Sequence, residues 1–197
     1  MKTALNRSAA AGVLISLGCI VYLKVGGVAG AILFSAGLWF VVNFDAELFT
    51  GRVTRPDYPV LQKLIMLAMN IAGATAIGIV SSCAMPEIRK PAVDMLTKLA
   101  ANGPLPVLWK SCLCGICMYL ATTKIEGVSR LPFVIYGVAL FILSGYSHSI
   151  ALAGYAGAAR GIAWWIIPVA ATGNALGSYG VKWLLMKLPS KNNNTTA

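Results

Sequence analysis

The chain has 197 residues, of which 58% are hydrophobic and 11% charged, and its formal net charge is +10. With a mean hydropathy of +0.76 it is more apolar than a soluble domain, in which roughly half of the residues are apolar. Its apolar segments approach the roughly 20 residues that a spanning helix needs and lack strand-like alternation, which indicates an α-helical membrane protein. The basic residues are scattered between these segments rather than gathered in one stripe, which argues against nucleic-acid binding.

Six apolar segments predict six transmembrane helices, at residues 8–25, 28–54, 59–83, 104–122, 131–155 and 161–187. The longest polar connection, residues 84–103, divides them into two groups of three, 8–83 and 104–187. Because each group has an odd number of spans, the groups enter the membrane in opposite senses, which predicts an inverted repeat within a single channel domain over residues 1–197. The distribution of Lys and Arg favours cytoplasmic termini.

Two of the six segments are interrupted by polar residues. Residues 44–51 (Phe-Asp-Ala-Glu-Leu-Phe-Thr-Gly) interrupt the second segment, and residues 146–149 (Tyr-Ser-His-Ser) interrupt the fifth. Non-helical backbone at membrane depth is tolerated only where it is buried in protein or lines a wet cavity. An interruption at the corresponding place in each half therefore predicts a transport site near the middle of the membrane.

His148 is the only histidine in the chain and falls within the second interruption. An ionisable residue inside a predicted span indicates a functional site, the alternative being a packing histidine bonded to a backbone carbonyl. Cys112, Cys114 and Cys117 are close in sequence but do not share one helix face, so we interpret them as buried thiols. With no clustered carboxylates and no metal-ligand spacing, the sequence predicts neither an enzyme nor a bound metal or cofactor.

Three motifs, in this order, resemble the formate/nitrite transporter family. They are residues 30–38 (Gly-Ala-Ile-Leu-Phe-Ser-Ala-Gly-Leu) followed by 46–51 (Ala-Glu-Leu-Phe-Thr-Gly), residues 144–151 (Ser-Gly-Tyr-Ser-His-Ser-Ile-Ala), and Ile167-Pro168-Val169 followed by Gly173-Asn174-x-x-Gly177. The resemblance implies an all-α membrane protein with an aquaporin-like protomer whose second and fifth helices are broken. It also implies a homopentamer in the inner membrane that conducts small monovalent anions, formate foremost, or nitrite or hydrosulfide.

The resemblance further implies roles for individual residues. The substrate pathway and proton relay would comprise His148, Thr50 and Asn174, and the apolar constrictions would comprise Phe34, Leu38, Leu48, Phe49 and Phe141. Anions would be attracted by Lys98, or alternatively Lys110, in the outer vestibule, and by Arg52 and Arg55 at the inner mouth unless these two are only membrane anchors. Because a bare anion is costly to desolvate between apolar constrictions, we expect His148, or a water that it orients, to supply a proton so that the neutral acid crosses.

The chain departs from the family's pattern at several places. Ser147 stands where family members usually have an acidic residue, and Gly115 stands where they have an asparagine. A short polar stretch, residues 52–59, replaces an apolar half-helix after the first interruption, and the sequence predicts no amphipathic helix at the N-terminus. These differences concern the choice of substrate and the inner mouth rather than the fold.

The main alternative function is an aquaporin-like channel for small neutral solutes, because such channels are also built around two mirrored interruptions. Aquaporins carry an Asn-Pro-Ala motif at each interruption, and neither interruption here has one. The sequence therefore favours the anion channel.

Overall fold

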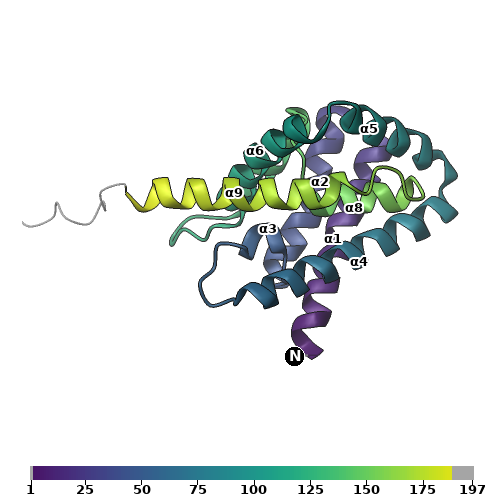
Figure 1. The fold of residues 1–197 in the computed structure, drawn as a ribbon. Coiled ribbons are helices and arrows are strands. Elements are labelled where there is room, and N and C mark those ends of the chain that lie inside the picture. Colours follow the sequence, from purple (N-terminus) through teal and green to yellow (C-terminus); the bar gives the residue numbers. More distant parts are fainter. Residues whose placement is uncertain (1, 188–197) are drawn as a thin grey trace, which may run out of the picture.

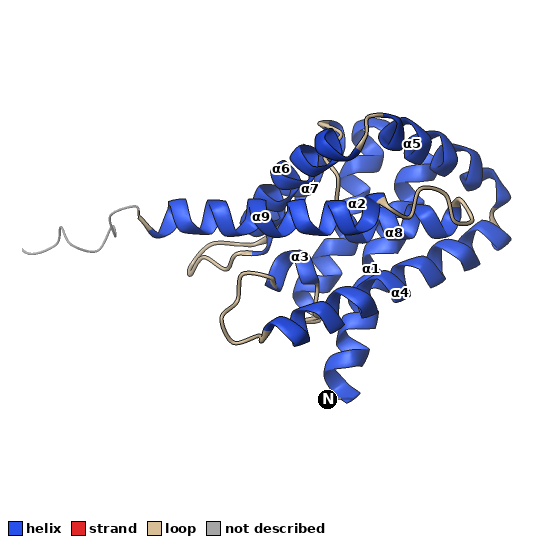
Figure 2. Ribbon diagram, in the orientation of Figure 1, coloured by secondary structure: helices blue, strands red, loops and turns tan. Residues whose placement is uncertain are grey.

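The computed structural model describes residues 2–187, and within them the chain is helical with no β-strand (Figure 1; Figure 2). The long helices are α1 (Lys2–Val25), α4 (Val60–Ala84), α6 (Pro104–Thr122) and α9 (Ile166–Met186). The shorter ones are α2 (Gly27–Asn43), α3 (Phe49–Arg52), the 3₁₀ turn η1 (Pro86–Ile88), α5 (Arg89–Ala101), α7 (Leu131–Leu143) and α8 (Ser149–Ala158). Residue 1 and residues 188–197, the ends that the charge distribution assigns to the cytoplasm, lie outside the described residues.

Within this part of the chain, three helices are long and apolar enough to cross a membrane, namely α1 over Ala4–Val25, α4 and α6. Helices α2, α7 and α8 are apolar but shorter. The bounds of α6 coincide with the predicted segment 104–122, whereas α1 begins well before residue 8, at Lys2. The connection 84–103 was expected only to be polar, yet α5 occupies most of it because Ala92 and Leu96 bury one face of the helix.

The helices of the two halves pack in matching pairs. Helix α1 packs on α4 and α6 packs on α9, while α2 packs against α7, and α8 fits against α1 and α4. In Figure 1, α3 and the C-terminal end of α9 lie toward one end of the bundle and α5 lies toward the other. This arrangement gives the bundle two distinct ends, which we call the α3 end and the α5 end.

Helices α2 and α7 end in the same way, and each end coincides with a predicted interruption. Beyond α2, Asp45 has a φ of 51°, and the N–H of Ala46 donates to the carbonyl oxygen of Val41 at 2.9 Å. Beyond α7, Gly145 has a φ of 68°, and the next N–H donates to the carbonyl oxygen of Phe141 at 2.8 Å. These are Schellman caps, which end a helix by turning the chain through the left-handed region. Glycine adopts that region freely, and aspartate is one of the few other residues that visit it.

Asn70, on α4, holds the backbone of the first interruption. Its Oδ1 accepts a hydrogen bond from the N–H of Phe49 at 2.7 Å, at the start of α3. Its Nδ2 donates to the carbonyl oxygen of Glu47 at 2.8 Å and to that of Ser8, on α1, at 2.6 Å. One side chain thus ties the interruption to two long helices.

Asn174, on α9, does the same for the second interruption. Its Oδ1 accepts a hydrogen bond from the N–H of Ser149 at 2.9 Å, at the start of α8, and its Nδ2 donates to the carbonyl oxygens of Ser147 and Ser111, both at 2.9 Å. Both asparagines are fully buried. Backbone groups that a continuous helix would have satisfied internally are therefore paired by an amide side chain.

Glycines allow the long helices to approach closely where the asparagines lie. A Cβ at Gly12, on α1, would collide with the carbonyl oxygen of Asn70, and a Cβ at Gly115, on α6, would collide with that of Asn174. Small residues at helix crossings are typical of membrane bundles, where packing rather than the hydrophobic effect holds helices together. The glycine at 115, which replaces the asparagine expected from the family resemblance, thus permits the close crossing of α6 and α9.

We expect Gly177→Ala to destabilise the protein, because a Cβ there would collide with the carbonyl oxygen of Cys112 on α6. Overpacking of this kind costs about 1–3 kcal/mol, which thermal unfolding in detergent would detect as a lower Tm. Gly180→Ala is the matched control on the same helix, because no atom lies within 4 Å of its added Cβ. It should leave Tm unchanged or raise it, and an equal loss in both variants would contradict the close-crossing argument.

Candidate functional site

His148 forms the N-cap of α8 and bonds Thr50, which lies on α3. Its Nδ1 accepts the backbone N–H of Ala151 at 3.1 Å, and its Nε2 lies 2.9 Å from the Oγ1 of Thr50. Because Nδ1 serves as an acceptor, we assign the proton of the neutral imidazole to Nε2, which then donates to Thr50. His148 is only 2% exposed and Thr50 only 1%. The two interruptions, far apart in sequence, thus meet at one buried hydrogen bond.

Aromatic and aliphatic side chains surround this pair. The ring of Phe141 stacks on the His148 imidazole with centroids 5.6 Å apart, and Phe34 meets Phe141 edge to face at 5.8 Å. Leu38 and Leu48 are buried in the same apolar core. The His148–Thr50 pair therefore lies in a setting with little water, where polar contacts are strong and bare charge is costly.

A cavity of about 250 Å³ reaches His148 from the α5 end, and we call it the α5-end cavity. Its lining includes Phe141, Ser147 and His148 together with two cations, Lys98 and Lys110, and no carboxylate. The hydroxyl of Ser147 is buried and has no hydrogen-bond partner among the described residues. Ser147, at the position where the resemblance implies an acid, thus carries an unpaired buried hydroxyl beside this cavity.

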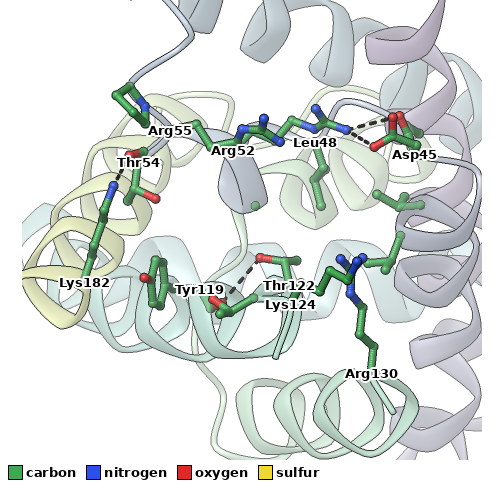
Figure 3. Close-up of a pocket in the computed structure, with 16 residues that line it drawn as sticks. Asp45, Leu48, Arg52, Thr54, Arg55, Tyr119, Thr122, Lys124, Arg130 and Lys182 are labelled. Carbon is green, nitrogen blue, oxygen red and sulfur yellow. Dashed lines mark hydrogen bonds and ion pairs between the residues drawn. The ribbon is translucent and has the colours of Figure 1, made fainter. Parts of the chain in front are cut away.

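A second cavity, of about 320 Å³, lies at the α3 end, and we call it the α3-end cavity (Figure 3). Leu48 and Gly51, which flank the segment that carries Thr50, belong to its lining. Five lining residues are cationic and one is acidic, namely Arg52, Arg55, Lys124, Arg130 and Lys182, and Asp45. Cavities therefore approach the buried pair from both ends of the bundle, and cations line each of them.

Two of the cations in the α3-end cavity are partly neutralised. Asp45 accepts hydrogen bonds from Arg7 and from Arg52, the latter at 2.5 Å. Arg55 pairs with Asp57 at 2.9 Å and 3.0 Å, and this hydrogen bonding holds the pKa of the Asp57 carboxyl below its usual value. The two arginines therefore have fixed carboxylate partners beside the cavity.

Helix α3 has only four residues, and side chains from α9 support the chain just beyond it. The Tyr179 hydroxyl donates to the carbonyl oxygen of Val53, and the Lys182 ammonium donates to that of Thr54, both at 2.7 Å. Helix α8, the corresponding element of the second half, runs for ten residues. The first interruption is therefore followed by a single turn of helix, α3, whereas the second is followed by the longer helix α8.

The structure brings together most of the residues expected at the site. His148 and Thr50 are in contact, Phe34 and Phe141 adjoin them, and Leu38 and Leu48 share their core. The expected cations Lys98 and Lys110 line the α5-end cavity, and Arg52 and Arg55 line the α3-end cavity.

Two of the expected residues make contacts other than those that the resemblance implies. The hydrogen bonds of the Asn174 amide go to backbone groups, as described above, rather than to the imidazole. Phe49 packs in a separate small cluster with Val53, Tyr58 and Met66. Both residues therefore support the site from outside it.

Three lining cations were not singled out from the sequence as site residues, namely Lys124, Arg130 and Lys182. Their only signal in the sequence is their position beside the ends of apolar segments, which is typical of membrane anchors. Within residues 2–187, His, Cys, Asp and Glu side chains form no group of three that would hold a metal ion.

Comparisons with known proteins bear on the family and the fold. The family model described as "Formate/nitrite transporter" matches residues 1–188. No curated protein matches the sequence of this chain. The structure is similar to a solved "Pentameric formate channel with formate bound", with a TM-score of 0.80, 18% identity, and coverage of 95% of this chain and 98% of that one. It is also similar to an "FNT family ion channel", with a TM-score of 0.77, 21% identity, and coverage of 93% and 90%. At such identities the likeness establishes the fold, and because the family model spans almost the entire sequence, the chain belongs to the formate/nitrite transporter family.

Proposed function

We propose that this protein is a channel for small monovalent anions, with formate as the first substrate to test and nitrite and hydrosulfide as further members of the class. The observation that carries the proposal is the buried His148–Thr50 hydrogen bond, approached from both ends by cation-lined cavities. The formate bound in a structurally similar pentameric channel supports formate as the first choice and a homopentamer as the assembly.

We propose that the chain crosses the inner membrane six times, with α2–α3 and α7–α8 as its interrupted spans. The matched Schellman caps and the matched asparagines support an inverted repeat of residues 8–83 and 104–187. The α3 end carries many of the basic residues, including Arg52, Lys124 and Lys182, so the positive-inside rule assigns it to the cytoplasm. The α5-end cavity then opens to the outside.

The proposed pathway begins with capture of an anion in the α5-end cavity. Lys98 and Lys110 attract it, and the free Ser147 hydroxyl together with the positive N-terminal end of α8 stabilises it beside His148. Further passage requires entry into the apolar core around Phe141 and Leu48, where a bare anion is costly. Uptake of a proton removes that cost, and the neutral acid crosses.

In this proposal His148 acts as a neutral imidazole whose Nδ1 stays bonded to Ala151. Protonation of Nδ1 would break that bond and uncap α8, so a water that His148 orients relays a proton from the solution in the α5-end cavity to the anion, and no imidazolium forms. Thr50 presents its hydroxyl to this imidazole in the buried region between the two cavities. Asn174 and Phe49 are assigned a supporting role, since their contacts lie within the scaffold.

We expect His148→Ala to reduce uptake of labelled formate into proteoliposomes by about tenfold to a hundredfold. The substitution removes the Nε2–H donor, which in this proposal turns from Thr50 to the passing anion or its water, and a hydrogen bond to a charged group is worth about 1.5–3 kcal/mol. Uptake by the parent should rise with an inward proton gradient, whereas uptake by the variant should stay low at every gradient. Passage of water or glycerol without anion flux in the parent would overturn the proposal and favour a neutral-solute channel.

A pH-sensitive dye enclosed in the vesicles distinguishes passage of the neutral acid from passage of the bare anion, because it measures the lumenal pH. If the neutral acid crosses, each formate carries one proton, so formate uptake should acidify the lumen without generating a membrane potential. Uptake that charges the membrane and leaves the lumenal pH unchanged would show that the bare anion permeates.

Thr50→Val removes the hydroxyl that accepts from His148 while keeping the side-chain shape, and Thr50→Ser keeps the hydroxyl. We expect the valine variant to lose about tenfold in formate flux, because the imidazole N–H is left without its partner in a buried site. The serine variant should remain within a few-fold of the parent. Equal flux in the valine and serine variants would show that the Thr50 hydroxyl does not act in permeation.

A further inference from the structure

Three cations that line the α3-end cavity, Lys124, Arg130 and Lys182, have no carboxylate partner among the described residues. Two of these cations, Lys124 and Arg130, make no side-chain ion pair or hydrogen bond with any described residue. Lys182 donates to the backbone carbonyl oxygen of Thr54. Glu126, in the same loop as Lys124, is exposed and does not belong to the lining.

These three cations come from two elements and lie on opposite sides of the cavity (Figure 3). Lys124 and Arg130 belong to the loop between α6 and α7, while Lys182 projects from α9 (Figure 3). Arg52, on α3, lies across the cavity from Arg130 in the same view. Such an arrangement matches a ligand with several charged oxygens, because an arginine binds two oxygens at once and a lysine binds one as a point charge.

We propose that the α3-end cavity is a binding site for a small multivalent oxyanion with phosphoryl groups, held by Lys124, Arg130 and Lys182. The cavity volume of about 320 Å³ accommodates a ligand the size of pyrophosphate. Thr54 also lines the cavity, and its hydroxyl adds a neutral donor.

A multivalent ligand at this site cannot follow the route proposed for a monovalent acid. The cavity is bounded toward the buried pair by Leu48, which is 1% exposed, and a single proton would leave such a ligand charged. The ligand therefore binds without passing and occupies the mouth through which a small anion leaves. This consequence rests on the proposed channel function, whereas the binding itself does not.

The test is isothermal titration of inorganic pyrophosphate into the purified full-length protein in a neutral detergent at low ionic strength. We expect saturable binding by the parent that weakens as salt is added, because opposite charges are screened. The double variant Lys124→Ala/Arg130→Ala should lose at least tenfold in affinity. The matched control is Arg89→Ala/Lys90→Ala, which removes the same charge from exposed positions on α5.

The conservative double variant Lys124→Arg/Arg130→Lys keeps both charges and should retain binding within a few-fold, which separates lost charge from a misfolded loop. Absence of binding by the parent, or equal loss in the α5 control, would overturn the proposal. Because binding is measured without transport, the result stands whether or not the protein conducts formate.

Lipid headgroups carry the same phosphoryl chemistry, so the titration is repeated in nanodiscs of phosphatidylcholine and of phosphatidylglycerol. A soluble ligand predicts pyrophosphate binding in both. Loss of binding only in phosphatidylglycerol would show that an anionic headgroup fills the cavity, and would overturn the assignment to a soluble ligand.

Discussion

The fold depends on one constraint, which is that every backbone polar group at the two interruptions needs a partner inside the protein. A helix that stops within an apolar environment leaves carbonyls at one end and N–H groups at the other, and no water replaces them. The Schellman caps after α2 and α7 satisfy the carbonyl ends, and Asn70 and Asn174 satisfy the N–H groups and the carbonyls that precede them. The helix ends and the asparagines form one arrangement, repeated in each half.

That arrangement also determines the chemistry at the centre. With its backbone held by Asn174, His148 is fixed at the start of α8, where its Nδ1 serves as the cap. The structural role of Nδ1 leaves only Nε2 to face the opposite interruption, where it meets Thr50. The tautomer of the imidazole is therefore a consequence of how the helix begins. The same position in the first half holds Leu48, which has no capping side chain, so the two halves share a scaffold and differ in chemistry.

The sequence predicted the features that depend on local patterns. Polar residues inside apolar segments marked both interruptions, and the single histidine inside one of them marked the candidate site. The sequence singled out Asn174, within the motif Gly173-Asn174-x-x-Gly177, but it did not indicate that this amide, or that of Asn70, binds backbone groups, because hydrogen-bond partners distant in sequence follow from packing. Helix α5 was missed, since its charged residues resemble a loop and only Ala92 and Leu96 face the bundle. The meeting of Lys124, Arg130 and Lys182 in one cavity was likewise not predictable, because it depends on how α6, α7 and α9 end in space.

The single turn of α3 has a consequence for the symmetry of the two mouths. Helix α8 runs for ten residues and is buried along its whole length, whereas α3 stops after four, and the space beyond it is bordered by Arg55, Thr54 and Lys182. One mouth is therefore lined by five cations and the other by two. At equal bulk concentration, the end with more positive charge concentrates small anions more strongly than the other end does. Since this enrichment is electrostatic, the difference between the two ends diminishes as ionic strength rises.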